Sequence, residues 1–132
     1  LSKIEAPLCV NREYQLPFDF DEEKANVCAS LFERTYDFTP FCKVNKEERD
    51  RVRTIYKCSL KNLGYGHYEI EVCGNGFLHN MVRIIAGTII DVAIGFIDFD
   101  EFKKKFYDNA LTRENTGRTL PPYGLYLKDV EY

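Results

Sequence analysis

Arg83 lies inside the most apolar stretch of the chain, residues 77–97. At helical spacing, the residues Asn80, Arg83, Gly87 and Asp91 fall on one narrow line, which we call the polar stripe, and apolar residues cover nearly all the rest of the helix. Burying a guanidinium without a counter-charge costs several kcal/mol. Arg83 therefore needs a partner, and a carboxylate beside it would be kept ionised because the guanidinium lowers its pKa.

The residues alone leave two interpretations of Arg83 open. In the first, the partner is local: Asp91, two turns along the same stripe, or water reached by extending the side chain to the surface. In the second, Arg83 pairs with a carboxylate from another segment and holds it ionised for chemistry. The helical pattern does not decide between them.

The cysteines and histidines do not form a metal-binding pattern. The five cysteines are widely spaced, odd in number and without a C-x-x-C pair. We interpret them as reduced thiols of an intracellular protein, and we expect a cytoplasmic location. Cys73 and His79 lack two further ligands at zinc spacing, so we expect no metal, and we expect no cofactor.

Two other kinds of site are not supported. Gly74-Asn75-Gly76 precedes a helix, but His79 stands where a dinucleotide-binding loop requires glycine. No Ser/His/Asp triad is indicated. His79 itself is more typical of a helix-face residue, near the core or near RNA, than of a general base.

Positive charge is concentrated in one part of an acidic chain. The net charge is −3 at pH 7, so no global field attracts nucleic acid. Residues 43–61, however, carry seven basic and three acidic side chains, among them Arg51, Arg53 and Lys57. This segment is either a solvated loop and strand face or a surface that contacts phosphates, in which case binding weakens with salt.

Two segments alternate with period two and predict a β-hairpin. In residues 51–60 and 67–72 the even positions are mostly apolar, so we expect them to be buried. Gly64-Tyr65-Gly66 between them has the composition of a turn. The opposite faces carry Arg and Lys on one strand and Glu on the other, which favours cross-strand pairing.

The remaining pattern predicts helices that cover this hairpin. Acidic residues precede an amphipathic helix at 22–32, Asn75 can cap a buried helix that Gly95 ends, and a third helix spans about 98–109. Residues 1–18 are expected to be an extended arm, 112–122 a loop and 124–132 a strand. The fold class is therefore α+β, an antiparallel sheet with helices packed on one face and the other face free to bind.

The chain of 132 residues has the length of one domain, and no stretch is long enough to cross a membrane. The longest uncharged run in the apolar region is residues 84–90, against the roughly 18 residues that a span needs. The first residue is Leu1 rather than methionine, so we expect the chain to begin inside a longer protein.

Four elements in order resemble the TruA family of tRNA pseudouridine synthases. Residues 75–88, N-G-F-L-H-N-M-V-R-I-I-A-G-T, resemble its N-x-F-L-x-x-M-V-R-x-x-x-G-T signature. Residues 117–127, G-R-T-L-P-P-Y-G-L-Y-L, resemble its G-x-T-x-P-x-x-G-L-x-L element. Y-D-F-T-P-F at 36–41 and R-T-I at 53–55 resemble two further elements. The resemblance implies the C-terminal half of a pseudouridine synthase fold.

The resemblance also implies a reaction and roles for single residues. The family converts uridine to pseudouridine in the anticodon arm of tRNA by means of an ionised aspartate, and its members are homodimers. Arg83 matches the arginine that pairs with that aspartate, and Leu125 matches a leucine that packs against the target base. Phe77, Asn80 and Gly124 are then expected at the substrate, and Arg51, Arg53, Lys57 and His79 at the RNA.

The segments of the family that carry the catalytic aspartate and an active-site tyrosine are absent from this chain. The resemblance therefore implies a C-terminal domain that supplies the arginine and one wall of the pocket and is inactive alone. The alternative is a non-catalytic RNA-binding or interaction domain on the same fold. Both interpretations predict contact with tRNA, and only the first predicts turnover once the other half is present.

Overall fold

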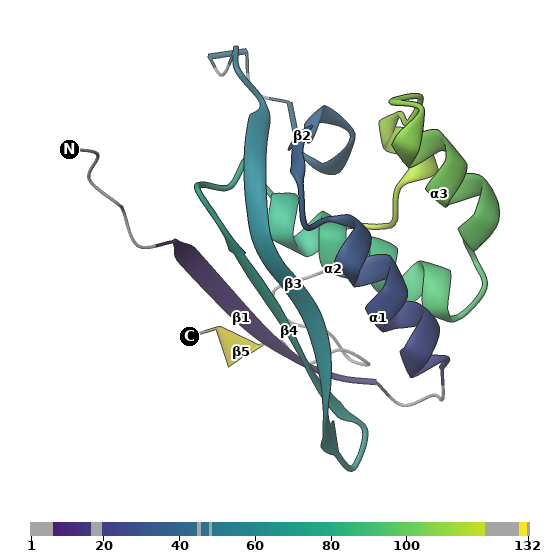
Figure 1. Cartoon of the computed structure of the whole chain (residues 1–132). Coiled ribbons are helices and arrows are strands. Elements are labelled where there is room, and N and C mark those ends of the chain that lie inside the picture. The colour runs from purple at the N-terminus through teal and green to yellow at the C-terminus, as the bar shows by residue number, and fades with distance from the viewer. Residues whose placement is uncertain (1–6, 17–19, 45, 48, 121–129, 132) are drawn as a thin grey trace.

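The computed structural model describes residues 7–16, 20–44, 46–47, 49–120 and 130–131. Its sheet has the strand order β2-β3-β4-β1-β5, and each neighbouring pair is antiparallel. The α-helices lie on one side of this sheet (Figure 1). The elements are β1 (Leu8–Gln15), α1 (Glu22–Leu31), β2 (Thr35–Asp37), η1 (Thr39–Phe41), β3 (Val52–Gly64), β4 (His67–Gly74), α2 (Met81–Ala93), α3 (Phe99–Tyr107), η2 (Arg113–Asn115) and β5 (Val130–Glu131).

The hairpin of β3 and β4 is confirmed, with one correction to its buried face. Tyr65 and Gly66 form the turn with φ of 54° and 77°, a conformation that suits the twist of a two-residue hairpin. On β3, however, Ile55 is buried, while Val52 and Tyr56 are exposed. The register shifts between Ile55 and Lys57, so an extra residue is inserted there and the buried side changes from odd to even positions.

The expectation that residues 1–18 form an arm is wrong for β1, which lies between β4 and β5. Its register sets Cys9 directly opposite Cys73, with the two Cα atoms 4.0 Å apart, and the two residues form a disulfide. The prediction of five reduced thiols is therefore wrong for these two cysteines. Cys28, Cys42 and Cys58 are buried and take no part in a disulfide.

The predicted first and third helices are confirmed, and they enclose an aromatic core. Asp21 caps α1 by accepting from the backbone N–H of Lys24, and Asp98 caps α3 in the same way. Between these helices and η1, rings meet edge to face or tilted at centroid distances of 5.1–6.3 Å. They belong to Phe32, Phe41, Phe102 and Phe106.

The buried helix α2 begins later than predicted. Asn75 does not cap it, because the Asn75 side chain accepts from the backbone N–H of Thr54 (2.9 Å) and so closes the end of the hairpin. Asn80 stands at the cap position with a left-handed backbone, φ 62°. Almost every residue of α2 is buried, and Arg83 is the partly buried exception. The helix is thus central to the fold, and Arg83 in its first turn is the one residue of the helix that is not fully buried.

The observed architecture is α+β, as predicted, and is consistent with part of the pseudouridine synthase fold. The loop expected at 112–122 contains η2, and the strand expected at 124–132 is described only as β5. Among the described residues, no helix is both long and apolar enough to span a membrane.

Candidate functional site

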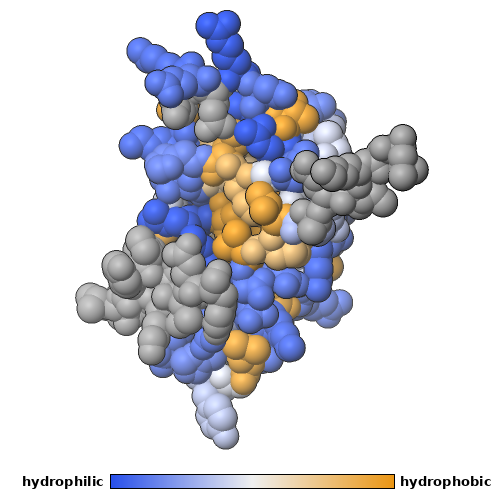
Figure 2. Space-filling model, turned by 90° about the vertical axis from the view of Figure 1, so that its left-hand side faces the viewer, coloured by the Kyte–Doolittle hydropathy of each residue, from blue (hydrophilic) through white to orange (hydrophobic). Residues whose placement is uncertain are grey.

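A hollow of about 280 Å³ lies between β1 and the first turn of α2. Its wall is mostly apolar and includes two arginines and one asparagine. The lining residues are Val10, Arg12, Phe77, Leu78, Asn80, Met81, Val82 and Arg83. Figure 2 views the molecule from the side of β1 and shows an apolar patch framed by hydrophilic residues. Such a wall suits a flat ring, and the guanidinium groups beside it suit an anion.

The guanidinium of Arg83 is held by two neutral oxygen atoms. Its Nε donates to the carbonyl of Leu120 (2.6 Å), and its Nη1 donates to Oδ1 of Asn80 (3.1 Å). An arginine has five N–H donors, so Nη2 and the second hydrogen of Nη1 have no hydrogen-bond partner among the described residues. Arg83 also has no ion pair within that part of the chain. Its charge and its outer donors remain available to a carboxylate.

Asp91 is not the partner of Arg83, because it is paired with Arg118. Nε and Nη2 of Arg118 donate to Oδ1 of Asp91 (3.1 and 2.8 Å), and the backbone N–H of Arg118 donates to Oδ2 (3.2 Å). The carboxylate of Asp91 is buried, and these bonds satisfy it. The local ion pair considered from the sequence is therefore excluded.

The polar stripe of α2 faces residues 117–120, which we call the docked segment. A Cβ on Gly87 would collide with the carbonyl oxygen of Arg118, and a Cβ on Gly117 would collide with the backbone nitrogen of Thr88. The N–H of Gly117 also donates to Oγ1 of Thr88 (2.8 Å). The glycine in the stripe thus marks a contact between two backbones.

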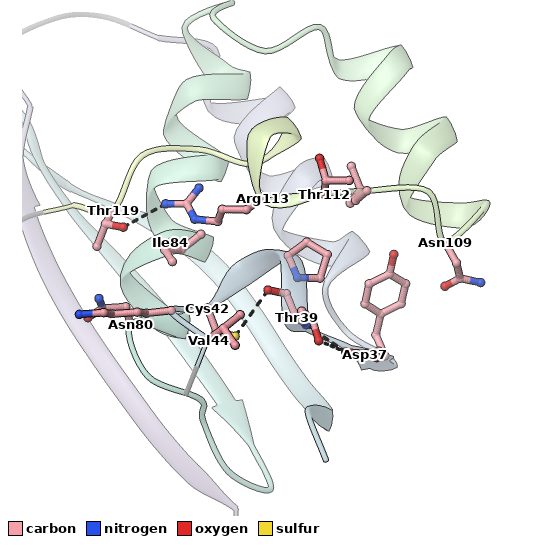
Figure 3. A pocket seen from close by; sticks show the side chains of 14 residues that line it. Asp37, Thr39, Cys42, Val44, Asn80, Ile84, Asn109, Thr112, Arg113 and Thr119 are labelled. Atoms are coloured by element: carbon pink, nitrogen blue, oxygen red, sulfur yellow. Dashed lines mark hydrogen bonds between the residues drawn. The ribbon is translucent and has the colours of Figure 1, made fainter. Parts of the chain in front are cut away.

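A larger hollow of about 840 Å³ adjoins the other side of Asn80. Figure 3 shows its wall, with Asn80 from the cap position before α2, Ile84 from α2 itself, and the hydrogen bond from Arg113 to Thr119 (3.1 Å). The lining combines apolar residues with hydroxyl, amide and charged groups; it comprises Tyr36, Asp37, Thr39, Pro40, Cys42, Lys43, Val44, Asn80, Ile84, Asn109, Leu111, Thr112, Arg113 and Thr119. Asn80 lines both hollows.

The profile of a family described as tRNA pseudouridine synthase matches residues 28–132, which include α2 and the docked segment. The chain belongs to this family. It is 45% identical over 123 residues to tRNA pseudouridine synthase A of Bacillus pumilus (strain SAFR-032), covering 92% of this chain and 49% of that protein. It is 48% identical over 98 residues to tRNA pseudouridine synthase A of Bacillus subtilis (strain 168), covering 74% and 38%.

A third relative, tRNA pseudouridine synthase A of Caldicellulosiruptor saccharolyticus, is 37% identical over 130 residues, which cover 98% of this chain and 52% of that protein. The chain therefore spans about half the length of the curated pseudouridine synthases that it matches. The similarity to the family was recognised correctly from the motifs around Arg83.

The structure brings together three of the residues that the sequence assigned to the site. Phe77, Asn80 and Arg83 line one hollow. Gly124 and Leu125 lie outside the described residues. Arg12 lines the same hollow and was missed. On β1 the inward positions are apolar except for Arg12, and this break in the alternation was the signal that could have found it.

The residues expected at RNA make separate sets of contacts in this chain. Lys57 pairs with Glu71 (2.7 Å) on the sheet face away from the helices, and this carboxylate raises the pKa of Lys57. Nη1 of Arg53 donates to the carbonyls of Asp50 and Val52 (both 2.9 Å). The backbone carbonyl of His79, an exposed residue, accepts from the N–H of Lys43 (3.0 Å).

Arg51 is partly buried and precedes β3, where its carbonyl accepts from the N–H of Phe38 (3.0 Å). The assignment of these four residues to RNA binding therefore stays a prediction. Among the described residues, no cluster of three or more His, Cys, Asp or Glu side chains could hold a metal ion.

Proposed function

We propose that this chain is the C-terminal domain of a tRNA pseudouridine synthase and that Arg83 forms the ion pair with a catalytic aspartate contributed by the rest of the protein. The observation that supports this most directly is the state of Arg83. Two neutral oxygens orient its guanidinium beside a largely apolar hollow, and its outer donors have no partner among the described residues. Those N–H groups can donate to both oxygens of a carboxylate in the bidentate geometry typical of arginine.

The reaction is an isomerisation of uridine within tRNA. The bond between N1 of the base and C1′ of the ribose breaks, the base turns, and a new bond joins C5 to C1′. The hydrogen lost from C5 is balanced by the one gained at N1. Phe77 lies in the wall of the Arg83 hollow, where its ring can contact the base. Asn80 orients Arg83, and Leu125 and Gly124 would complete the wall.

The proposed task of Arg83 is electrostatic. A positive charge held in place before the reaction keeps the aspartate ionised, because protonating that carboxylate would leave the guanidinium without its counter-charge. On this proposal the chain alone is inactive, since it supplies no nucleophile. The complete protein would act inside the cell as a homodimer that binds tRNA, with Arg51, Arg53, Lys57 and His79 among the groups that contact RNA.

The test measures turnover by the full-length protein. Tritium at C5 of uridine in tRNA is released as the new bond forms, so its release follows the reaction. We expect Arg83→Ala to lower the rate by about 10²–10³, as for other preorganised electrostatic groups. Arg83→Lys should recover part of this loss, because lysine keeps the charge without the fork. The affinity for tRNA should change little, because contacts to the phosphate backbone of the RNA dominate it.

Lys105→Ala is the matched control, because Lys105 pairs with Glu101 on the surface of α3, away from the hollow. Unchanged turnover in Arg83→Ala would refute the role of Arg83. Binding of tRNA without any turnover by the full-length parent would instead support the alternative of a non-catalytic RNA-binding domain.

A further inference from the structure

The docked segment is held on α2 at both of its ends. At one end, Arg118 is bound to the buried carboxylate of Asp91 by two side-chain bonds and one backbone bond. At the other end, the N–H of Leu120 donates to the carbonyl of Arg83 (3.3 Å), and the carbonyl of Leu120 accepts from Nε of Arg83. Only Thr119 separates the two attachments.

A second arginine holds the docked segment from the opposite side. Nη1 of Arg113 donates to the carbonyl of Gly117 (2.7 Å) and to Oγ1 of Thr116 (2.8 Å). Nη2 of Arg113 donates to Oγ1 of Thr119, as Figure 3 shows. This contact begins in η2 and does not reach α2. Two side chains of α2 therefore hold the first half of the docked segment: Thr88 accepts one bond from the N–H of Gly117, and Asp91 accepts three bonds from Arg118 and is the charged attachment.

The direction of the Arg83 guanidinium depends on where the Leu120 carbonyl lies. Leu120 belongs to no helix or strand, so regular backbone hydrogen bonds do not fix that carbonyl. A functional side chain is held precisely only if the residues that contact it are themselves fixed by packing and hydrogen bonds. Near this carbonyl, the strongest attachment of the docked segment is made by Arg118, two residues away. Its guanidinium donates two charge-assisted hydrogen bonds to the buried carboxylate of Asp91.

We infer that Asp91 and Arg118 are positioning residues for Arg83: their ion pair fixes the docked segment on α2, and the Leu120 carbonyl thereby aims the guanidinium into the hollow. The inferred consequence for catalysis rests on the proposed function. The geometric part does not, because it concerns only how Arg83 is held.

The first arm of the test is independent of turnover. In full-length protein labelled with ¹⁵N-arginine, the Nε–H of Arg83 should exchange slowly with solvent because Leu120 accepts it, and Arg83→Lys identifies its signal by removing it. We expect Arg118→Ala to accelerate this exchange by about tenfold or more. Arg118→Lys should accelerate it less, because lysine keeps the charge and loses the fork. Lys105→Ala should leave the exchange unchanged.

The second arm is a double-mutant cycle on kcat. We expect Arg118→Ala to lower kcat about tenfold in the parent, with KM for tRNA nearly constant, and by less than about twofold in the Arg83→Ala background. A role confined to stability would give the same factor in both backgrounds. Thermal unfolding confirms that each variant is folded, and Asp91→Asn, which keeps the shape of the side chain, replaces Arg118→Ala if the latter does not fold.

Unchanged exchange at Arg83 in a folded Arg118→Ala or Asp91→Asn variant would overturn the inference, whatever the activity. Equal losses of kcat in both backgrounds would also overturn it. A parent without turnover, combined with accelerated exchange in the variants, would support the positioning role and refute the proposed function. The two failures can therefore be told apart.

Discussion

Arg83 and Leu120 bind each other through both a side chain and the backbone. Nε of Arg83 donates to the Leu120 carbonyl at 2.6 Å, and the Leu120 N–H donates to the Arg83 carbonyl at 3.3 Å. The two residues are far apart in the sequence, and the second has no regular secondary structure. This reciprocal contact connects the orientation of a functional side chain to the packing of a loop on a helix.

Replacing Gly87 by alanine should destabilise the protein, although the same change inside an ordinary helix stabilises it by up to about 1 kcal/mol. The new Cβ would collide with the carbonyl of Arg118, so the docked segment has to move away from α2. We expect a loss of about 1–3 kcal/mol, typical of overpacking a close contact. Urea unfolding measures it.

The control for Gly87→Ala is Lys104→Ala, an exposed change in α3 that should stay within about 0.5 kcal/mol. A Gly87→Ala variant that is more stable than the parent would show that the docked segment can move away from α2 without loss of stability. The close contact would then contribute nothing to the free energy of unfolding.

The disulfide between Cys9 and Cys73 leads to a second prediction. It closes a sequence separation of 64 residues, so removing it should lower the free energy of unfolding by about 2–4 kcal/mol. Cys9→Ser is the suitable change because Cys9 is exposed and serine there buries no new polar group. In dithiothreitol the variant and the parent should unfold at the same urea concentration. A difference that persists in the reductant would contradict this account.

The parts of the fold that the sequence predicted are those with a local pattern. Alternation located β3 and β4, acidic residues at its start located α1, and phenylalanines at helical spacing located α3. The polar stripe of α2 was also found, because helical spacing alone places its residues in line. What covers the stripe was not found, since the docked segment lies some thirty residues further on and has no periodicity.

The errors have the same origin. The pairing of Cys9 with Cys73 depends on the register between two strands that are distant in the sequence, and no local pattern encodes that register. Asn75 has the composition of a helix cap, but a tertiary bond to Thr54 uses its side chain instead. The motif that identified Arg83 did not identify Arg12, whose position follows only once β1 is placed in the sheet.

Burial predicts that two thiols are unreactive in the folded protein. It raises the pKa of Cys28 from 9.0 to about 12 and also raises the pKa of Cys58. At pH 8 the thiolate fraction of Cys28 should be about 10³ lower than that of an unfolded cysteine, so alkylation by iodoacetamide should slow accordingly. Mass spectrometry of digested protein measures both sites, and protein unfolded in urea serves as the control.

The same shift fixes the sign of a pH effect on stability. Because the folded pKa of Cys28 is above the unfolded value, the unfolded state loses its proton first as pH rises. The contribution of Cys28 to the free energy of unfolding is therefore fully present below about pH 9 and is lost as the pH rises toward about 12. Replacing Cys28 by alanine should flatten this decline, and an equally steep decline in the variant would assign it to other groups.

Two substitutions at Asn80 can separate the two properties of that residue. Its backbone is left-handed, with φ 62°, and its Oδ1 accepts from Arg83. Glycine keeps the backbone conformation at no steric cost and removes the side chain, whereas alanine removes the side chain and adds strain of about 1–2 kcal/mol. We therefore expect Asn80→Ala to be the less stable variant by about that amount in urea unfolding.

The effect of these two variants on turnover should depend on the loss of the Asn80 side chain and not on the backbone conformation. If Oδ1 of Asn80 helps to orient Arg83, both variants should lower kcat by a similar factor, about tenfold, because both lose that acceptor. An Asn80→Gly variant with the parent's kcat would show that the Leu120 carbonyl orients Arg83 without help. In that case the conformation at position 80 would serve only to start α2 beside the hollow.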